Sequence, residues 1–199
     1  MPRSAQYDRE TALQAAVDLF WQRGFYATSL KDIEKALDMR PGSLYAAFGN
    51  KQQLFDSAID AYAQRMTIDV NRFIEQEAGV IDGVLAYLRW LLVGDDRTSL
   101  TETPACLVVK TLLESTDESD PLRSKSRQLL QGVEKCFAQA LEQAKATGEL
   151  KASVDCERLA RLLQTQVMGA RSFAQSSPDA EHINNLVDDI ALIFAPYRQ

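Results

Sequence analysis

The sequence predicts an all-α protein of about nine helices, in which an N-terminal three-helix bundle with a helix-turn-helix precedes a larger helical domain. Three observations support this fold class. Apolar residues recur at i, i+3 and i+4 over most of the 199 residues. Glycine and proline are few, and several of them mark breaks between the periodic segments. Residues 28–55 have the pattern of two short helices, a tight turn and the start of a long helix.

The two short helices carry clear start and stop signals. Ser29 is a natural N-cap for the first of them. Its apolar face consists of Leu30, Ile33 and Leu37. Pro41-Gly42 stops a continuous helix, and Leu44 and Phe48 resume the apolar spacing four residues apart. The segment therefore predicts a helix-turn-helix.

The outward face of the second short helix suggests a partner. Its side chains are small or neutral: Ser43, Tyr45, Ala46 and Ala47. Arg40 precedes this helix and Lys51 follows it. A helix of this kind can enter the major groove of DNA, where the base edges are read. The alternative is an ordinary helical hairpin inside an all-α core, and the spacing alone favours neither.

The segment from Arg9 to Leu54 resembles the N-terminal DNA-binding domain of the TetR family of bacterial repressors. The resemblance rests on Ala16, Leu19, Phe20, Gly24, Phe25, Thr28, Ser29, Leu30, Asp32, Ile33, Gly42, Ser43, Leu44, Tyr45, Phe48, Lys51 and Leu54. The sequence differs from the family pattern at Leu37–Arg40, where members often have Ala-Gly-Val-Ser, and at Ala47, where they often have His. The family implies a dimeric repressor that binds a palindromic operator in double-stranded DNA.

The resemblance also implies roles for individual residues. Thr28, Tyr45 and Lys51 correspond to positions that hold phosphates. The residues expected to approach base edges are Arg40, Gly42, Ser43 and Ala46. Among these, Arg40 is the best candidate for a specific contact to guanine.

Charge and composition limit the classes of protein to which this chain can belong. The net charge is −6, although residues 1–55 carry seven Lys/Arg against six Asp/Glu. The basic patch typical of phosphate binding is therefore weak, which indicates modest affinity per subunit. No apolar run reaches the ~20 residues of a membrane span. The N-terminus lacks a signal sequence, so we expect a cytoplasmic protein. The three cysteines fit neither a disulfide framework nor a metal site.

The remaining periodic segments predict the other helices, and we place the domain boundary between residues 1–50 and 51–199. The expected helices cover residues 51–77, 80–93, 104–115, 120–148, 155–175 and 177–196, with a loop at 94–102. Apolar stripes mark the last two: Leu159, Leu162, Leu163, Val167, Ala170 and Ala174, then Ile183, Leu186, Val187, Ile190, Ala191 and Phe194. They fit either the core of one subunit or the four-helix dimer interface that the family implies. We expect a homodimer.

The family also implies a small-molecule inducer that binds in the C-terminal domain. Aromatic and flexible apolar residues are the expected pocket lining: Tyr62, Met66, Tyr87, Trp90, Phe137 and Met168. Lys110 and Arg171 would favour an anionic or electrophilic ligand. The alternative for each of these residues is an ordinary place in the core.

Cys106 provides a chemical hypothesis for sensing. Thr103 and Pro104 are candidates for the N-cap and first residue of a helix, which would put Cys106 in its first turn. The helix dipole there stabilises a thiolate, which reacts with electrophiles. Residues 105–110 resemble the N-ethylmaleimide-reductase repressors, a TetR subgroup that senses electrophiles through a cysteine. The alternative is that Cys106 is purely structural and that the inducer is a hydrophobic molecule bound without a covalent bond. Cys136 fits the core, and Cys156 is a weaker second candidate.

Enzymatic readings find no support, so we expect neither catalytic residues nor a cofactor. The only histidine, His182, begins an amphipathic segment. No phosphate-binding glycine loop, metal-spaced Cys/His cluster or nucleophile elbow occurs. A helical adaptor that binds proteins remains an alternative, and it would show no salt-dependent affinity for DNA.

Overall fold

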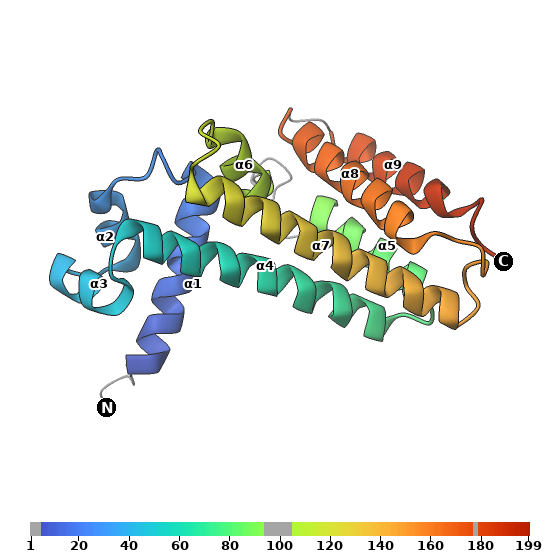
Figure 1. The fold of residues 1–199 in the computed structure, drawn as a ribbon, viewed down its shortest axis with the longest axis horizontal. Helices are drawn as coiled ribbons and strands as arrows, with labels where there is room; N and C mark the ends of the chain where they lie inside the picture. Colours follow the sequence, from blue (N-terminus) through green and yellow to red (C-terminus); the bar gives the residue numbers. More distant parts are fainter. Residues whose placement is uncertain (1–4, 94–104, 177–178) are drawn as a thin grey trace. The chain divides into compact units, whose positions relative to one another are not determined.

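The computed structural model describes residues 5–93, 105–176 and 179–199, and within these residues it is built from nine α-helices (Figure 1). In chain order they are α1 (Ala5–Arg23), α2 (Leu30–Leu37), α3 (Pro41–Phe48), α4 (Lys51–Gln76), α5 (Val80–Val93), α6 (Leu107–Glu114), α7 (Pro121–Ala146), α8 (Cys156–Ala174) and α9 (Ala180–Ala191), followed by the 3-10 turn η2 (Leu192–Phe194). The predicted all-α class is confirmed.

Several helix boundaries differ from the prediction, and the starts of three helices differ most. Helix α1 begins at Ala5 rather than at Arg9. Helix α6 begins at Leu107 rather than at Pro104, and α9 begins at Ala180 with Asp179 as its N-cap rather than at Ser177-Pro178. Thr103, Pro104, Ser177, Pro178 and the predicted loop at 94–102 lie outside the described residues.

Contacts between residues divide the chain into two compact units. Unit 1 contains residues 1–65 and 107–129, and unit 2 contains residues 66–106 and 130–199. Helices α4 and α7 each contribute residues to both units. The boundary predicted after residue 50 falls between α3 and α4, and it stays a prediction.

Aromatic packing holds unit 1 together. The ring of Phe20 from α1 meets the ring of Phe55 from α4 edge-on, with centroids 4.9 Å apart, and both side chains are fully buried. The ring centroid of Phe25, in the turn after α1, lies 4.9 Å from that of Phe55. Trp21 and Tyr62 form a second contact between α1 and α4, at 5.7 Å. These contacts fix the position of α4 relative to α1 and its following turn.

The turn between α2 and α3 is built locally. Ser29 caps α2 as predicted: its Oγ accepts a hydrogen bond from the Asp32 amide (3.2 Å), and Asp32 Oδ2 accepts one from the Ser29 amide (2.8 Å). Helix α2 ends at Asp38, which adopts the left-handed conformation with φ 50°. Asp38 thus takes the backbone conformation usually supplied by glycine, so the turn forms without the family's common Gly.

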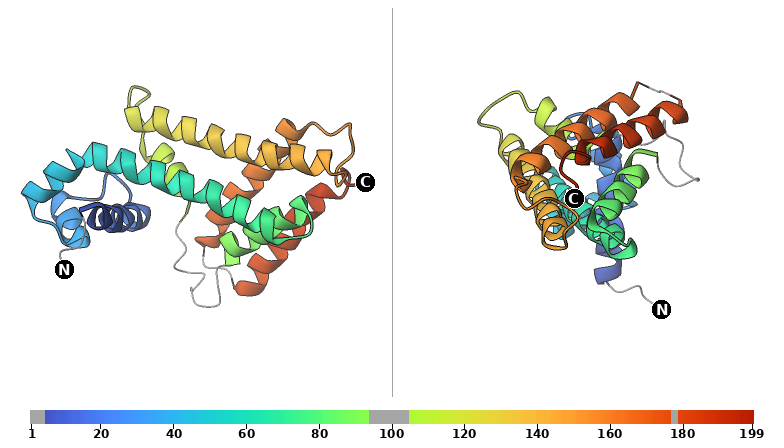
Figure 2. Two further views of the ribbon diagram at one scale, coloured as in Figure 1. Left: turned by 90° about the horizontal axis from the view of Figure 1, so that it is seen from below. Right: turned by 90° about the vertical axis from the view of Figure 1, so that its right-hand side faces the viewer.

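Unit 2 has its core between α5, α8 and α9, and Figure 2 shows α8 and α9 side by side. The two predicted stripes lie mostly inside this core. The buried members are Leu159, Leu163, Val167, Ala170, Ala174, Ile183, Val187, Ile190 and Phe194. For most of these side chains the structure therefore favours the first of the two alternatives, the core of one subunit, because the same subunit already covers them. Leu186 and Ala191 are half-buried, and Leu162 is exposed over 41% of its surface.

The start of α5 is a point of close backbone approach. A Cβ atom at Gly83 would lie 2.9 Å from the amide nitrogen of Ile74 in α4 and closer still to its Cα. Glu149 caps the same helix, since its carboxylate accepts hydrogen bonds from the amides of Val80 (2.9 Å) and Ile81 (3.0 Å). Only glycine fits position 83 in this arrangement.

Gly83→Ala should therefore destabilise the protein by about 2–3 kcal/mol, because the clashing atoms belong to the backbone and cannot rotate away. Gly132→Ala is the matched control, since a Cβ at this position of α7 meets nothing within 4 Å. That control should raise the free energy of unfolding by about 0.5–1 kcal/mol. Urea unfolding of both variants checks the pair, and equal effects would contradict the packing described here.

The pKa of the Asp32 carboxyl is lowered to about 2, by the hydrogen bonds from the Ser29 hydroxyl and amide and then by Arg23. Because the folded pKa lies below the unfolded value of about 3.9, the stabilisation is complete above that value and is lost as the pH falls from about 4 to about 2. Asp32→Asn should accordingly be less stable than the wild type at pH ~6, and the difference should vanish near pH ~2. Urea unfolding across this range checks it, and a difference independent of pH would contradict the capping box as its source.

Candidate nucleic-acid interface and sensor region

Helix α3 is buried on one side and exposed on the other. Leu44 and Phe48 are 5% and 6% exposed and fix its inner side. The exposed residues at its start and along its outer side are Arg40, Pro41, Gly42, Ser43, Tyr45 and Ala46. Pro41 occupies the first helical position, where its missing amide proton costs nothing. The structure thus brings the predicted base-reading residues together on one accessible surface.

Lys51 begins α4 at one end of this surface. Its Nζ lies 4.2 Å from the centroid of the Phe25 ring, and partial burial lowers the pKa of its ammonium group. Asn50 and Gln53 cap the helix reciprocally, with the Asn50 Oδ1 accepting from the Gln53 amide (2.9 Å) and the Gln53 Oε1 accepting from the Asn50 amide (3.1 Å). Lys51 is therefore a positioned cation at a helix start.

Thr28 does not lie on this surface, which corrects the sequence-based expectation that it holds a phosphate. Its side chain is 1% exposed, and its hydroxyl donates a 2.6 Å hydrogen bond to the carbonyl oxygen of Gly24. Gly24 has φ 82° and ends α1. The hydroxyl stabilises the turn between α1 and α2, so its donor is already used.

Lys110 is also placed differently from the prediction. Its Nζ donates a 3.0 Å hydrogen bond to the carbonyl oxygen of Gln22, at the C-terminal end of α1. A cation there satisfies a free helix carbonyl and the negative end of the helix dipole. Lys110 belongs to unit 1, whereas most of the predicted pocket residues belong to unit 2. The sequence could not show its long-range contact with Gln22.

The turn between α6 and α7 joins the turn between α1 and α2. The Tyr26 hydroxyl donates a hydrogen bond to the Asp120 carboxylate, which also accepts one from the Ser115 hydroxyl. The bond to Asp120 raises the pKa of the Tyr26 phenol. Together with Lys110, these side chains attach α6 and the start of α7 to the end of α1 and to the turn between α1 and α2 within unit 1.

The predicted pocket residues are only partly gathered. Tyr62 lies in unit 1 against Trp21, whereas the other five aromatic or methionine residues and Arg171 belong to unit 2. There the rings of Tyr87 and Trp90 are 6.0 Å apart, and Phe73 of α4 lies near both, at 6.0 and 5.6 Å. Phe73 was not among the predicted pocket residues. It follows Met66 by seven residues, a spacing that places both on one face of the helix and could have identified it. Phe137 and Arg171 are buried, and Met66 and Met168 are half-buried.

The cysteines differ in environment. Cys106 is 8% exposed and lies directly before Leu107, so it precedes the first turn of α6 instead of lying within it. Burial raises the pKa of the half-buried Cys136 thiol. Burial and then the nearby Glu142 raise the pKa of Cys156 to about 11, which disfavours its thiolate and the sensing role considered for it.

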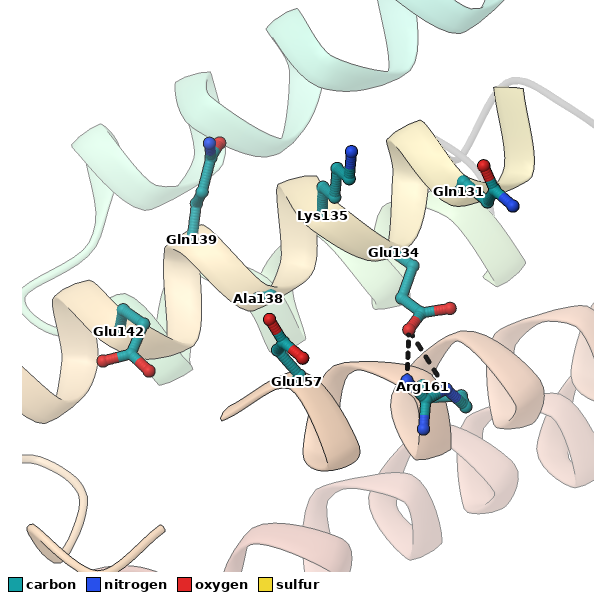
Figure 3. Close-up of a pocket in the computed structure, with 8 residues that line it drawn as sticks. All are labelled: Gln131, Glu134, Lys135, Ala138, Gln139, Glu142, Glu157 and Arg161. Atoms are coloured by element: carbon teal, nitrogen blue, oxygen red, sulfur yellow. Dashed lines mark hydrogen bonds and ion pairs between the residues drawn. The ribbon is translucent and has the colours of Figure 1, made fainter. Parts of the chain in front are cut away.

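A surface groove between α7 and α8, of about 680 Å³, was not predicted (Figure 3). Arg161 of α8 bonds Glu134 of α7 across it, with Nε and Nη2 at 3.1 and 3.0 Å from the same oxygen. The rest of its lining is Gln131, Lys135, Ala138, Gln139, Glu142 and Glu157. None of the predicted sensor residues lies in it, and no local sequence signal marks residues brought together by two helices.

The described residues contain neither a cluster of metal ligands nor a membrane-spanning helix. No three His, Cys, Asp or Glu side chains gather there closely enough to bind a metal ion. None of the helices in those residues has the length and apolarity needed to cross a membrane.

Family models match both parts of the chain. The model described as bacterial regulatory proteins, tetR family, matches residues 12–58, which include the exposed face of α3. The model described as the C-terminal domain of tetracyclin repressor-like proteins matches residues 86–189.

Individual relatives agree with these models. The HTH-type transcriptional repressor ComR of Escherichia coli is 29% identical over 185 residues, covering 91% of this chain and 86% of ComR. The repressor NemR of Escherichia coli is 27% identical over 200 residues, covering 98% of each chain. A cysteine mutant of the TetR family transcriptional regulator CifR, solved in complex with double-strand operator DNA, has a TM-score of 0.81 and 31% identity over 96% of this chain and 97% of CifR. The chain therefore belongs to the TetR family of bacterial regulatory proteins, and it is a DNA-binding transcriptional regulator.

Proposed function

We propose that this protein is a homodimeric repressor that binds a palindromic operator through α3 of each subunit and leaves it when a small molecule binds or Cys106 is modified. The observation that carries the proposal is the exposed, small-residue face of α3 above a buried apolar underside, with Arg40 before it and Lys51 after it. CifR, the relative solved with operator DNA, supports this use of the fold.

The roles of the exposed residues follow from their size and charge. Gly42, Ser43 and Ala46 let the helix approach the floor of the major groove. The Arg40 guanidinium, which makes no hydrogen bond as an N-cap, would read guanine through its two parallel donors. Tyr45 and Lys51 would bind phosphates and fix the position along the duplex.

The exposed face of α8 supports dimerisation. Leu162, Gln166, Gly169 and Phe173 follow a spacing of four, three and four, which puts them on one side of the helix. Leu162 and Phe173 are 41% and 47% exposed, and a Cβ at Gly169 would meet nothing within 4 Å. A second copy packed on this face would cover both apolar side chains, with Gly169 allowing close approach of the helices. A symmetric pair can place two recognition helices ~34–36 Å apart, one turn of DNA.

The contacts of α6 support a route from sensor to DNA. Cys106 directly precedes α6, and Lys110, Ser115 and Asp120 attach α6 and the start of α7 to the end of α1 and to Tyr26. A displacement of α6 would alter these contacts and favour a geometry of the DNA-binding segment that no longer matches two successive grooves. The inducer acts by its preference for that geometry.

The covalent version needs a defined reaction at Cys106. Its thiolate sulfur would add to the β-carbon of an α,β-unsaturated carbonyl, forming an S–C bond while the alkene electron pair moves towards the carbonyl. Protonation of the resulting enolate carbon completes the addition, so the thiol proton is retained overall. At 8% exposure, the thiol must become accessible before an electrophile reaches it. The non-covalent version uses the aromatic cluster of Phe73, Tyr87 and Trp90 and leaves Cys106 structural.

Treatment with one equivalent of N-ethylmaleimide should lower the affinity for DNA from the flank of the protein's own gene by at least about tenfold, a cost of ~1.4 kcal/mol. Cys106→Ser should bind the same DNA and resist the reagent, while the matched control Cys136→Ser should stay sensitive. Mobility-shift titration measures the affinity, and mass spectrometry of the modified protein locates the adduct. If wild type and Cys106→Ser release DNA alike, the covalent version is wrong.

The dimer face has its own test. Gly169→Arg should raise the dimer dissociation constant about 100-fold, since burying an unpaired charge in an interface costs ~3 kcal/mol. Gly132→Arg is the matched control, because it puts the same side chain at an equally open glycine on α7. Sedimentation analysis over a range of concentrations compares the two. Dimerisation of Gly169→Arg at wild-type strength would exclude this face.

A further inference from the structure

The exposed surface of α3 has two flanks with different neighbours. On one flank, Tyr45, Gly49 and Lys51 line a small depression with Leu30 of α2. On the other, Arg40, Ser43 and Ala47 line an open groove of about 700 Å³ that is completed by the first half of α1, including Arg9. The second flank thus carries two arginines from different helices.

Arg9 is held in place by packing. Its guanidinium carbon lies 5.2 Å from the centroid of the Phe48 ring, and Phe48 is 6% exposed and anchored in the core of unit 1. The side chain of Arg9 is exposed nonetheless. Its charged end is therefore both accessible and fixed beside the last turn of α3.

The charge of Arg9 is not neutralised by a partner within the described residues. In the same unit, Arg23 pairs with Asp32, and Arg123 and Arg127 pair with Glu118. Neither Arg9 nor Arg40 makes such an ion pair among the described residues. One carboxylate, that of Asp38, lines the groove, so the two arginines leave it with a net positive charge.

The geometry of DNA places a phosphate backbone beside the flank of α3 that carries Arg9 and Arg40. A major groove is ~12 Å wide and a helix with its side chains ~10–12 Å across, so a helix lying in the groove has one phosphate backbone along each flank. In the proposed function, Lys51 and Tyr45 bind phosphates of the strand on the first flank. On the second flank the proposed function directs Arg40 to a base, and the hydroxyl of Thr28 is buried, so Arg9 is the cation lining this groove that remains for the second strand.

We infer that Arg9 is a phosphate-binding residue that holds the DNA strand on the flank of α3 opposite Lys51. The inference rests on the proposed insertion of α3 into the major groove. Arg9 positions the duplex and reads no base, because a phosphate contact carries no sequence information. Its planar donors suit a phosphate held in two hydrogen bonds, and the Phe48 ring limits the freedom lost on binding.

The test compares Arg9→Met, Arg9→Lys and Arg127→Ala in full-length protein, by titrating labelled duplexes at several salt concentrations. One duplex carries DNA from the flank of the protein's own gene, and the other is unrelated DNA of equal length. Arg9→Met keeps an unbranched apolar stem on Phe48 and should lower the salt slope by about one per subunit and the affinity for both duplexes by about tenfold. Arg9→Lys should keep the slope. Arg127→Ala removes a charge that is paired with Glu118 and should leave it unchanged.

An unchanged slope in Arg9→Met, or a loss confined to one duplex, would overturn the inference. Replacing single phosphates with methylphosphonates tests it on the wild-type protein, where the folding of a variant plays no part. Sensitive phosphates should occur on both strands beside each half-site, and sensitivity of one strand alone would also overturn it. If the wild-type protein shows no salt-dependent binding to either duplex, the proposed function fails instead.

Discussion

The packing of Phe20, Phe25 and Phe55 is the constraint on which the rest of unit 1 depends. It joins α1, the following turn and α4 in one buried contact. The same Phe25 ring carries Lys51 on its face, and its neighbour Tyr26 bonds Asp120 at the start of α7. A cation proposed for DNA and a contact proposed for sensing are therefore fixed by a single aromatic cluster. Displacement of either element has to disturb this cluster, in which the rings of Phe20 and Phe55 are fully buried.

The chain has a net charge of −6, and several of its arginines are paired with carboxylates within the described residues. Three arginines of unit 1, Arg23, Arg123 and Arg127, are neutralised by Asp32 or Glu118. The cations that we propose for DNA are few, and each is held by packing or by its place at a helix start. A small number of fixed contacts makes binding by one subunit weak, and it makes the symmetric doubling of those contacts important.

The sequence predicted the parts of the structure that depend on local patterns. The N-cap role of Ser29 and the limits of α5 follow from neighbouring residues, and both were found as expected. The burial of Thr28 and the bond from Lys110 to Gln22 join segments whose approach no local pattern records. Likewise, the spacing of the apolar residues in α8 identified an apolar face but could not show which element covers it. The face left for a partner, around Gly169, became visible only once the core was known.

The placement of the two tryptophans has a practical consequence. Trp21 lies against Tyr62 in unit 1, whereas Trp90 lies against Phe73 and Tyr87 in unit 2, with the guanidinium of Arg72 5.7 Å from its ring. Each compact unit thus contains one natural fluorophore in a distinct environment. Replacing either indole by phenylalanine leaves an emission signal from one unit alone, so changes in the DNA-binding part and in the aromatic cluster can be followed separately in real time.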